Sequence, residues 1–363
     1  SLPPVVEKSR LEVVFLTDQK YTNLTAIAVD SLASSFVRGT AGHDLSIHVV
    51  CIGVDEAGKQ FMRQAVAPYA ANGVTLSCVD HALKGDPQGK QRWLQLVSLK
   101  LHLPGILPQL DRAIFLDSDI VVVGDLVPLW QTSLDGHWMG AVPCVLDHPR
   151  CLDNYNIFKV RFTRAAKPLN AGVILFDLAK MRTLGVSQIL ERWQTEHLPQ
   201  LKLPEQEAIA VNYPGQWKAL PHAWNFRPYG EPYWAASSWP EFREYLSISP
   251  VIVHFQGNVR PFDLKMDQPY FQDWLRSHQR INPGKPLQRK RLGYFQFVFF
   301  EYPDMLCRIG NLLPGGLLRF GLMIPLLGLL MLPYALWSYL RYLRTPEGYR
   351  WRIYRYMAAP GAE

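Results

Sequence analysis

The short spacings that mark common cofactor sites are missing from this sequence of 363 residues. It has no Cys-x-x-Cys pair, no Walker-type phosphate loop and no Gly-x-Gly-x-x-Gly segment. Kinase, NTPase and dinucleotide-binding functions therefore lose their main signal. An odd, scattered set of cysteines indicates reduced thiols in a cytoplasmic setting, without a zinc site or a disulfide framework. They are Cys51, Cys78, Cys144, Cys151 and Cys307.

Excess positive charge is missing from most of the chain and gathers near its end. Residues 1–284 hold 27 basic and 27 acidic side chains, whereas residues 285–363 hold 11 and 4, so the tail carries the whole net charge of +7. Arginines alternate there with Tyr and Trp, which is typical of segments that bind an anionic membrane surface. We therefore predict two parts, a folded domain of residues 1–284 and a membrane-attachment tail of residues 285–363.

The tail contains an apolar segment, residues 320–340, which is about long enough to span a bilayer. Pro325 and Pro333 interrupt it and both flanks are basic, so we expect peripheral or monotopic attachment to the cytoplasmic face of a membrane. A spanning helix is the competing interpretation. Nucleic acid ranks below a membrane as partner, because nucleic-acid binding does not need the apolar segment. Residues 1–10 have no apolar core, so no cleavable signal is expected there.

Strand-like and helix-like segments alternate along the first domain. The pattern predicts a doubly wound, mostly parallel, Rossmann-like α/β sheet that binds its ligand at the carboxyl ends of the strands. Residues 217–240 are rich in Pro, Trp and Tyr, which favours a rigid loop platform. The expected strands are residues 11–16, 45–51, 74–79, 113–116, 173–176 and 251–255. The expected helices are residues 55–69, 92–103, 178–197 and 205–211.

Two carboxylates, Asp117 and Asp119, follow one of these buried strands. They would repel each other and lose hydration unless a cation lay between them. Mg²⁺ and Mn²⁺ are commonly shared between carboxylates and substrate phosphates, so the pair predicts a divalent metal and a phosphate-bearing ligand. The alternative is a strand that ends in a polar turn, with Asp119 and Asp125 in solvent.

Four segments, in this order, carry a resemblance to a known family. They are residues 14–21 (Val-Phe-Leu-Thr-Asp-Gln-Lys-Tyr), residues 115–119 (Phe-Leu-Asp-Ser-Asp), residues 169–173 (Leu-Asn-Ala-Gly-Val) with 204–207 (Pro-Glu-Gln-Glu), and residues 254–262 (His-Phe-Gln-Gly-Asn-Val-Arg-Pro-Phe). Together they resemble the retaining glycosyltransferases of family 8, which include bacterial lipopolysaccharide galactosyl- and glucosyltransferases and, more distantly, glycogenin. The resemblance runs from about residue 11 to about residue 263.

This resemblance implies a GT-A catalytic domain that uses a UDP-sugar donor and Mn²⁺ or Mg²⁺. The acceptor would be a hydroxyl of a glycan or glycolipid, which with the basic tail favours lipopolysaccharide biosynthesis at the bacterial inner membrane. The metal would lie on Asp117, Asp119 and His254. The donor would contact Thr17, Asp18, Tyr21, Lys100, Ser118, Asn170, Gly257 and Arg260, with Gly172 turning the chain beneath Asn170. Gln206, Glu205 and Asp117 are the expected catalytic residues.

Two departures from the family pattern bear on the donor. Glu205 stands where Asp is usual, and its extra methylene could change which sugar hydroxyl is bound. Lys100 stands where close relatives carry Arg. The lysine loses the bidentate geometry that an arginine provides. From the residues alone, Lys100 could be a solvated helix lysine, Arg260 part of a surface turn, and His254 a structural histidine.

The implied reaction moves a hexose, from UDP-glucose or UDP-galactose by preference, with retention at the anomeric carbon. Gln206 is a poor nucleophile and no carboxylate is evident in its place, so front-face displacement is favoured over double displacement. A haloacid dehalogenase-type phosphatase or phosphotransferase using Asp117 is one alternative, although that fold places its motif on the first strand. A non-catalytic, membrane-attached sugar-nucleotide binding protein is the other.

Overall fold

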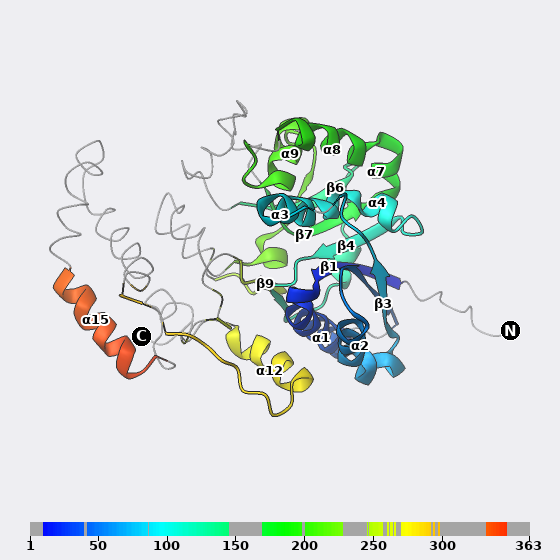
Figure 1. Ribbon diagram of the computed structural model, residues 1–363. Helices are drawn as coiled ribbons and strands as arrows, with labels where there is room; N and C mark the ends of the chain where they lie inside the picture. The colour runs from blue at the N-terminus through cyan, green and yellow to red at the C-terminus, as the bar shows by residue number, and fades with distance from the viewer. Residues whose placement is uncertain are drawn as a thin grey trace.

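The protein is described by a computed structural model, which places its elements around one large and one small β-sheet (Figure 1). The described residues are 10–39, 42–85, 87–144, 169–197, 200–227, 245, 247–256, 260, 262–263, 265, 270–291, 293–294, 297 and 332–346. The strands are β1 (Arg10–Asp18), β2 (Asp44–Ile52), β3 (Val74–Asp80), β4 (Arg112–Leu116), β5 (Ile120–Val122), β6 (Met139–Pro143), β7 (Leu169–Asp177), β8 (Lys218–Ala219) and β9 (Ile252–His254). The α-helices are α1 (Thr22–Gly39), α2 (Glu56–Val66), α3 (Gly89–Ser98), α4 (Leu103–Ile106), α5 (Val127–Trp130), α7 (Leu178–Leu184), α8 (Val186–His197), α9 (Pro204–Asn212), α12 (Phe271–Ile281) and α15 (Leu332–Arg344).

The central sheet has seven strands in the order β3-β2-β1-β4-β7-β6-β8. β1 pairs in parallel with β2 and β4, and β2 pairs in parallel with β3. β7 runs antiparallel to β4 and β6, while β6 and β8 are parallel. The expected mixed α/β fold with a mostly parallel sheet is therefore confirmed, and its antiparallel part lies around β7.

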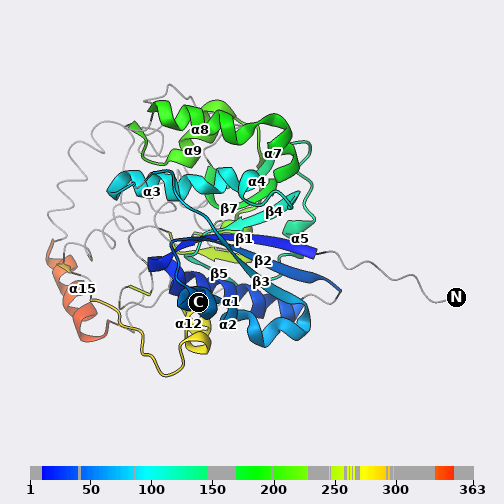
Figure 2. The ribbon, with the colours of Figure 1, turned by 45° about the vertical axis from the view of Figure 1, so that its right-hand side comes forward.

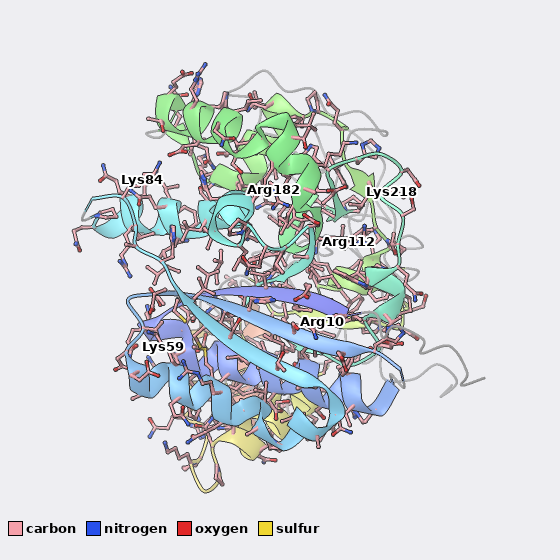
Figure 3. All side chains as sticks on the ribbon, turned by 90° about the vertical axis from the view of Figure 1, so that its right-hand side faces the viewer. Arg10, Lys59, Lys84, Arg112, Arg182 and Lys218 are labelled. Carbon is pink, nitrogen blue, oxygen red and sulfur yellow. The ribbon has the colours of Figure 1, made fainter. Side chains whose placement is uncertain are left out.

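Helices cover both faces of this sheet (Figures 1 and 2). α1 and α2 lie on one face, and α3, α4, α7, α8 and α9 lie on the other. Along β1, Val13 and Phe15 pack in the core beneath α1, whereas Val14 packs in the opposite core. Because successive side chains of a strand point to opposite faces, a strand covered on both sides is continuously apolar. On the second face, Arg182 of α7 ties that helix to the backbone carbonyl of Leu110 (Figure 3).

Several elements differ from the sequence-based expectations. Helix α1 was not predicted, because it is buried on most sides and has no continuous polar face. The single helix expected over residues 178–197 is two helices, since Gly185 adopts a left-handed φ of 62° and ends α7. The helix expected over residues 55–69 ends at Val66 and continues as a 3-10 helix over Ala67–Asn72.

A small antiparallel sheet of β5 and β9 lies beside the central sheet and positions the site. Its register pairs Ile120 with His254 and Val122 with Ile252. β5 begins directly after Asp119, so the pairing carries the carboxyl end of β9 to the two carboxylates that follow β4. The strand expected over residues 251–255 is confirmed as β9, and the sheet partner that it finds is 130 to 134 residues distant in sequence.

Of the expected tail, the structure describes helix α15 and the short segments that precede residue 298. Tyr342 of α15 is fully buried in an aromatic cluster with Phe297, Phe271 and Trp274, the last two from α12. Pro333 lies in the first turn of α15, where its missing N–H needs no partner. Pro325 lies outside the described residues. Among the described helices, none combines the length and apolar character that crossing a bilayer requires.

A buried ion pair attaches α12 to α1. Asp30 of α1 is 2% exposed and accepts hydrogen bonds from Arg280 Nε at 3.0 Å and from Tyr69 Oη at 3.1 Å. The contacts of Asp30 with Arg280 raise the pKa of the guanidinium, although burial alone would lower it. The pair therefore holds the segment after β9 against the first half of the sheet.

We predict that Arg280→Ala lowers the free energy of unfolding by about 2–3 kcal/mol, because it leaves the buried carboxylate of Asp30 without its cation. The matched control is Arg276→Ala on the same helix. Arg276 pairs with Asp273 in the same helical turn, and this pair is exposed to solvent. That change should cost less than about 0.5 kcal/mol. Urea unfolding of the two variants measures both values, and equal losses would contradict a role for the buried pair.

Candidate active site

A cavity of about 240 Å³ lies at the carboxyl ends of β1, β2 and β4. Strand β1 contributes the residues at its end, and α3 presents one face, with Trp93, Leu96 and Val97 leading inward to Lys100. Most of the residues expected at the donor and the metal are among its walls. The full lining is Leu16, Thr17, Asp18, Tyr21, Ile52, Trp93, Leu96, Val97, Lys100, Asp117, Ser118, Asp119, Glu205 and Arg260.

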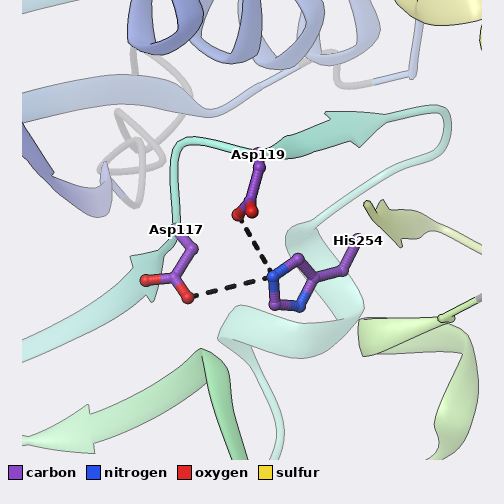
Figure 4. A group of neighbouring side chains, drawn as sticks. All are labelled: Asp117, Asp119 and His254. Carbon is purple, nitrogen blue, oxygen red and sulfur yellow. Dashed lines mark hydrogen bonds and ion pairs between the residues drawn. The ribbon is translucent and has the colours of Figure 1, made fainter. Parts of the chain in front are cut away.

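Asp117, Asp119 and His254 converge at this cavity (Figure 4). His254 Nε2 lies 3.2 Å from Asp119 Oδ1 and 3.9 Å from Asp117 Oδ2, and one ligand atom from each residue falls within 4.8 Å of the others. The side chain of Asp119 is only 14% exposed. The alternative in which Asp119 is a solvated turn residue is therefore wrong, and Asp125 caps α5 by accepting from Val127 N.

The neighbours of His254 determine which of its ring nitrogens faces the carboxylates. Nδ1 lies 3.0 Å from Asn225 Oδ1, and the amide nitrogen of Asn225 donates to Asn170 Oδ1 at 2.8 Å. With its amide so oriented, Asn225 Oδ1 accepts a hydrogen bond from Nδ1–H, which directs the Nε2 lone pair to the space between the carboxylates. Neutral imidazole in this tautomer is a metal ligand.

Gly172 makes room for that imidazole. A Cβ at this position would lie 2.1 Å from His254 Cε1 and 2.5 Å from Nδ1, closer than non-bonded atoms approach. Gly172 lies inside β7, so the expectation that it turns the chain is wrong; its role in the structure is to admit His254. Its carbonyl also accepts from Asp117 N at 2.9 Å, which holds the end of β4 against β7.

Each carboxylate of the triad has a cation on its other oxygen. Lys100 Nζ lies 3.1 Å from Asp117 Oδ1, and Arg260 Nη2 lies 3.2 Å from Asp119 Oδ2. Burial alone would raise the pKa of Asp119, but His254 and Arg260 outweigh burial and hold the pKa below its ordinary value. Lys100 is buried, so the interpretation of a solvated helix lysine is wrong. Arg260 does begin a turn, in which its carbonyl accepts from Asp263 N at 3.0 Å, but its side chain contacts Asp119.

The residues expected at the uridine line the opposite side of the cavity. Asp18 Oδ1 caps a 3-10 helix, Gln19–Tyr21, by accepting from Lys20 N and Tyr21 N, and its Oδ2 lies 3.6 Å from Arg92 Nη2. The hydroxyl of Thr17 accepts from Thr25, which also bonds Ser118 at 2.7 Å. Tyr21 is exposed, and the guanidinium of Arg260 lies 5.8 Å from its ring centroid.

The residues expected at the donor sugar are buried beside the triad. Asn170 is 6% exposed and donates to Gln256 Oε1 at 2.7 Å, while its own Oδ1 accepts from Gly172 N. Glu205 and Gln206 lie in the first turn of α9, where acidic side chains suit the helix dipole. Gln206 is not among the cavity walls. Gly257 lies outside the described residues.

The carboxyl of Glu205 is held in an apolar setting. Its Oε1 is 4.0 Å from Lys100 Nζ, and its Oε2 is buried with no hydrogen-bond partner in the described part of the chain. Burial raises the pKa of Glu205, and Lys100 only partly offsets that effect. A buried acceptor without a partner suits a ligand hydroxyl, which would donate to it.

Two carboxylate oxygens and one imidazole nitrogen around a common space fit a divalent cation such as Mn²⁺ or Mg²⁺. Sequence reasoning found all three ligands but missed Asn225, which orients His254, and Trp93, which is 43% exposed at the cavity. The position of Asn225 after a Trp-rich stretch carries no signal by itself. Trp93 could have been found, since it precedes Lys100 by two helical turns on the same face.

Comparison with known proteins finds one family model over most of the described domain. The model described as "Glycosyl transferase family 8" matches residues 12–263. Among curated relatives, "Probable galacturonosyltransferase 7" from Arabidopsis thaliana is 28% identical over 203 residues, which cover 54% of this chain and 31% of the relative. The chain thus spans about a third of the length of the first curated relatives that it matches.

Solved structures share the fold. The galactosyltransferase LgtC, in complex with donor and acceptor sugar analogs, superposes with a TM-score of 0.60 at 20% identity and covers 76% of this chain and 98% of its own. The apo structure of the bifunctional glycosyltransferase WbbM gives a TM-score of 0.59 at 17% identity, covering 79% of this chain and 51% of its own. These likenesses establish a GT-A-like arrangement of the sheet and its helices.

We predict that Gly172→Ala weakens Mn²⁺ binding by about tenfold or more, because the added methyl displaces His254 from the carboxylates. The matched control is Gly105→Ala, where an added Cβ meets nothing within 4 Å. Manganese titration followed by electron paramagnetic resonance compares the two. Unchanged affinity in Gly172→Ala, with the protein folded, would remove His254 from the ligand set.

Proposed function

The chain belongs to glycosyltransferase family 8, and from that membership we propose that it transfers a hexose from a UDP-sugar to a hydroxyl of a glycan or glycolipid. The proposed reaction depends on a divalent metal and retains the configuration at the anomeric carbon. The observation that carries the proposal is the convergence of Asp117, Asp119 and His254 beside Thr17 and Asp18 at one end of the sheet. This arrangement suits a sugar-nucleotide donor, whose nucleoside would bind at the residues that end β1 and whose diphosphate would bind the metal beside them.

For the donor we favour UDP-glucose or UDP-galactose over a UDP-hexuronic acid. The described wall near the triad contains the carboxyls of Asp117, Asp119 and Glu205. Its two cations, Lys100 and Arg260, already contact Asp117 and Asp119. A uronate carboxylate at this wall would compete with Asp117 and Asp119 for these two cations, whereas a neutral hexose needs no cation. The galacturonosyltransferase names of some relatives are therefore not carried over to this chain.

In the proposed mechanism a divalent ion supplies positive charge for the departing diphosphate. Arg260 donates to the same diphosphate, since its Nε is buried with no partner among the described residues and needs an acceptor. Glu205 would accept from a sugar hydroxyl. The family resemblance implies that Gln206 lies beside the anomeric carbon, although Gln206 is not among the walls of the described cavity. The leaving phosphate takes the proton of the acceptor hydroxyl as the new bond forms on the same face of the sugar, so no protein nucleophile is required.

The two alternatives from the sequence are not favoured. A haloacid dehalogenase-type enzyme would carry its aspartate on the first strand, whereas Asp117 follows β4, after three parallel strands. A binding protein without catalysis has no need for a complete set of metal ligands, and the three are present with an orienting partner for His254.

The test of this function is a screen of the purified chain against UDP-glucose, UDP-galactose, UDP-xylose and their N-acetyl relatives with Mn²⁺, with the released anomer assigned by NMR. We expect hydrolysis or transfer from a neutral UDP-hexose, and loss of turnover by a factor of about 10³ or more in chelator or in Asp119→Asn. Asp111→Asn, on an exposed carboxylate, is the control. Full activity of Asp119→Asn or in chelator would contradict metal dependence.

We also propose that residues 285–363 attach the catalytic domain, residues 1–284, to the cytoplasmic face of a membrane, where a lipid-linked acceptor would lie. Helix α15 supports this proposal because it has two apolar sides. One side packs on the aromatic cluster around Phe297, and the other exposes Leu332, Leu336, Trp337 and Leu340. Arg341 and Arg344 are exposed on the same side, which suits anionic headgroups.

We predict that changing Leu336 and Trp337 together to Glu lowers binding to vesicles that contain anionic phosphatidylglycerol by about tenfold or more, because it removes apolar contact area and adds repulsion. Ile189→Glu on α8, an exposed apolar residue elsewhere, is the matched control and should bind as the unchanged chain does. Donor hydrolysis in solution should persist in both. Equal vesicle binding by all three proteins would exclude α15 as the membrane contact.

A further inference from the structure

Lys100 is a buried lysine that forms part of the cavity wall. Its side chain is 4% exposed, and its Nζ donates to Asp117 Oδ1 at 3.1 Å and to the carbonyl of Ala171 at 3.0 Å. The ammonium also lies 4.7 Å from the ring centroid of Phe115. The lysine therefore places its positive charge directly beside Asp117.

The two carboxylates divide their oxygens between cations and the space in front of His254. Asp117 turns Oδ1 to Lys100 and Oδ2 toward His254, and Asp119 turns Oδ2 to Arg260 and Oδ1 toward His254. Each of the two carboxylates therefore has a basic side chain at one oxygen and the imidazole of His254 beside the other. Glu205 adds at most one more negative charge, and burial raises its pKa.

This balance has a consequence for ligand binding. A divalent cation alone would add two positive charges to a site already neutralised by its own side chains, and in a partly buried setting that repulsion is only weakly screened. A nucleoside diphosphate brings two or more negative charges. The charges therefore balance best when cation and diphosphate are present together.

Lys100 and Arg260 differ in how they could respond to an arriving phosphate. Arg260 has a side chain that is 24% exposed, and its Nε lacks a partner among the described residues, so it can turn to an arriving phosphate. Lys100 makes its two hydrogen bonds to protein oxygens, and its side chain is only 4% exposed. Of the two cations, Lys100 is therefore the more tightly held.

We propose that Lys100 is a positioning residue that makes divalent-cation binding conditional on the diphosphate, by weakening the site for the metal alone. This inference rests on the proposed function, because it takes a nucleoside diphosphate as the second ligand. It differs from the role of a direct donor contact expected for Lys100 from the family resemblance. The lysine would favour entry of the metal together with the sugar nucleotide over prior loading with free metal.

The test is a Mn²⁺ titration followed by electron paramagnetic resonance on the full chain, alone, with uridine and with UDP. Lys100→Met removes the charge and keeps much of the length, and Lys100→Arg is the matched control that keeps the charge. We expect Lys100→Met to bind Mn²⁺ alone about tenfold more tightly than the unchanged chain, and the strengthening by UDP to shrink by a similar factor. Uridine, which has no phosphate, should leave the affinity for Mn²⁺ unchanged in both the unaltered chain and Lys100→Met.

Opposite results would overturn the inference. If Lys100→Met binds Mn²⁺ less tightly both with and without UDP, Lys100 only holds Asp117 in place and its charge does not set the affinity. If Lys100→Met does not fold, Arg260→Gln removes the other positive charge and should also tighten binding of Mn²⁺ alone; unchanged or weaker binding there would contradict the charge balance. Failure of the proposed function looks different, because UDP would then leave Mn²⁺ binding unchanged in the unaltered chain.

Discussion

The negative charge of Asp117 and Asp119, placed at the end of a strand buried on both faces, is the constraint on which this end of the molecule depends. Neither carboxylate can be left without a partner there, and the structure supplies Lys100 to one and Arg260 to the other. Their remaining oxygens face His254. The residues that compensate these carboxylates also surround the space between them and His254, so the stability of this region and the proposed ligand binding would depend on one set of side chains.

The scaffold holds this arrangement through contacts that are distant in sequence. Pairing of β5 with β9 brings His254 to Asp119, and Gly172 in β7 leaves the space that the imidazole fills. Asn225 then orients the ring, and its amide nitrogen donates a hydrogen bond to Asn170 Oδ1. Three segments thus contribute to one histidine, which explains how a residue on a two-stranded sheet can be as well positioned as those on the central sheet.

The helix that closes the described part of the chain relates the site to its surroundings. α15 is anchored by Tyr342 in an aromatic cluster shared with α12, and α12 is tied to α1 by Arg280 and Asp30. Its opposite side exposes leucines and Trp337 beside arginines. An exposed apolar side on a docked helix indicates an interaction surface. A membrane there would present glycolipid acceptors to a domain held at its surface, in agreement with the charge of the tail.

The sequence by itself determined the order of most strands, the α/β class, the family and all three candidate metal ligands. It did so because buried strands are continuously apolar and because the ligands lie within short motifs such as Phe-Leu-Asp-Ser-Asp. Only the tertiary structure decided the antiparallel placement of β7, the break at Gly185, the burial of Lys100 and the part played by Asn225. The break at Gly185 follows from its left-handed backbone, and the others depend on contacts between separate segments, such as Lys100 with the carbonyl of Ala171 and Asn225 with His254. Local periodicity carries no information about such contacts.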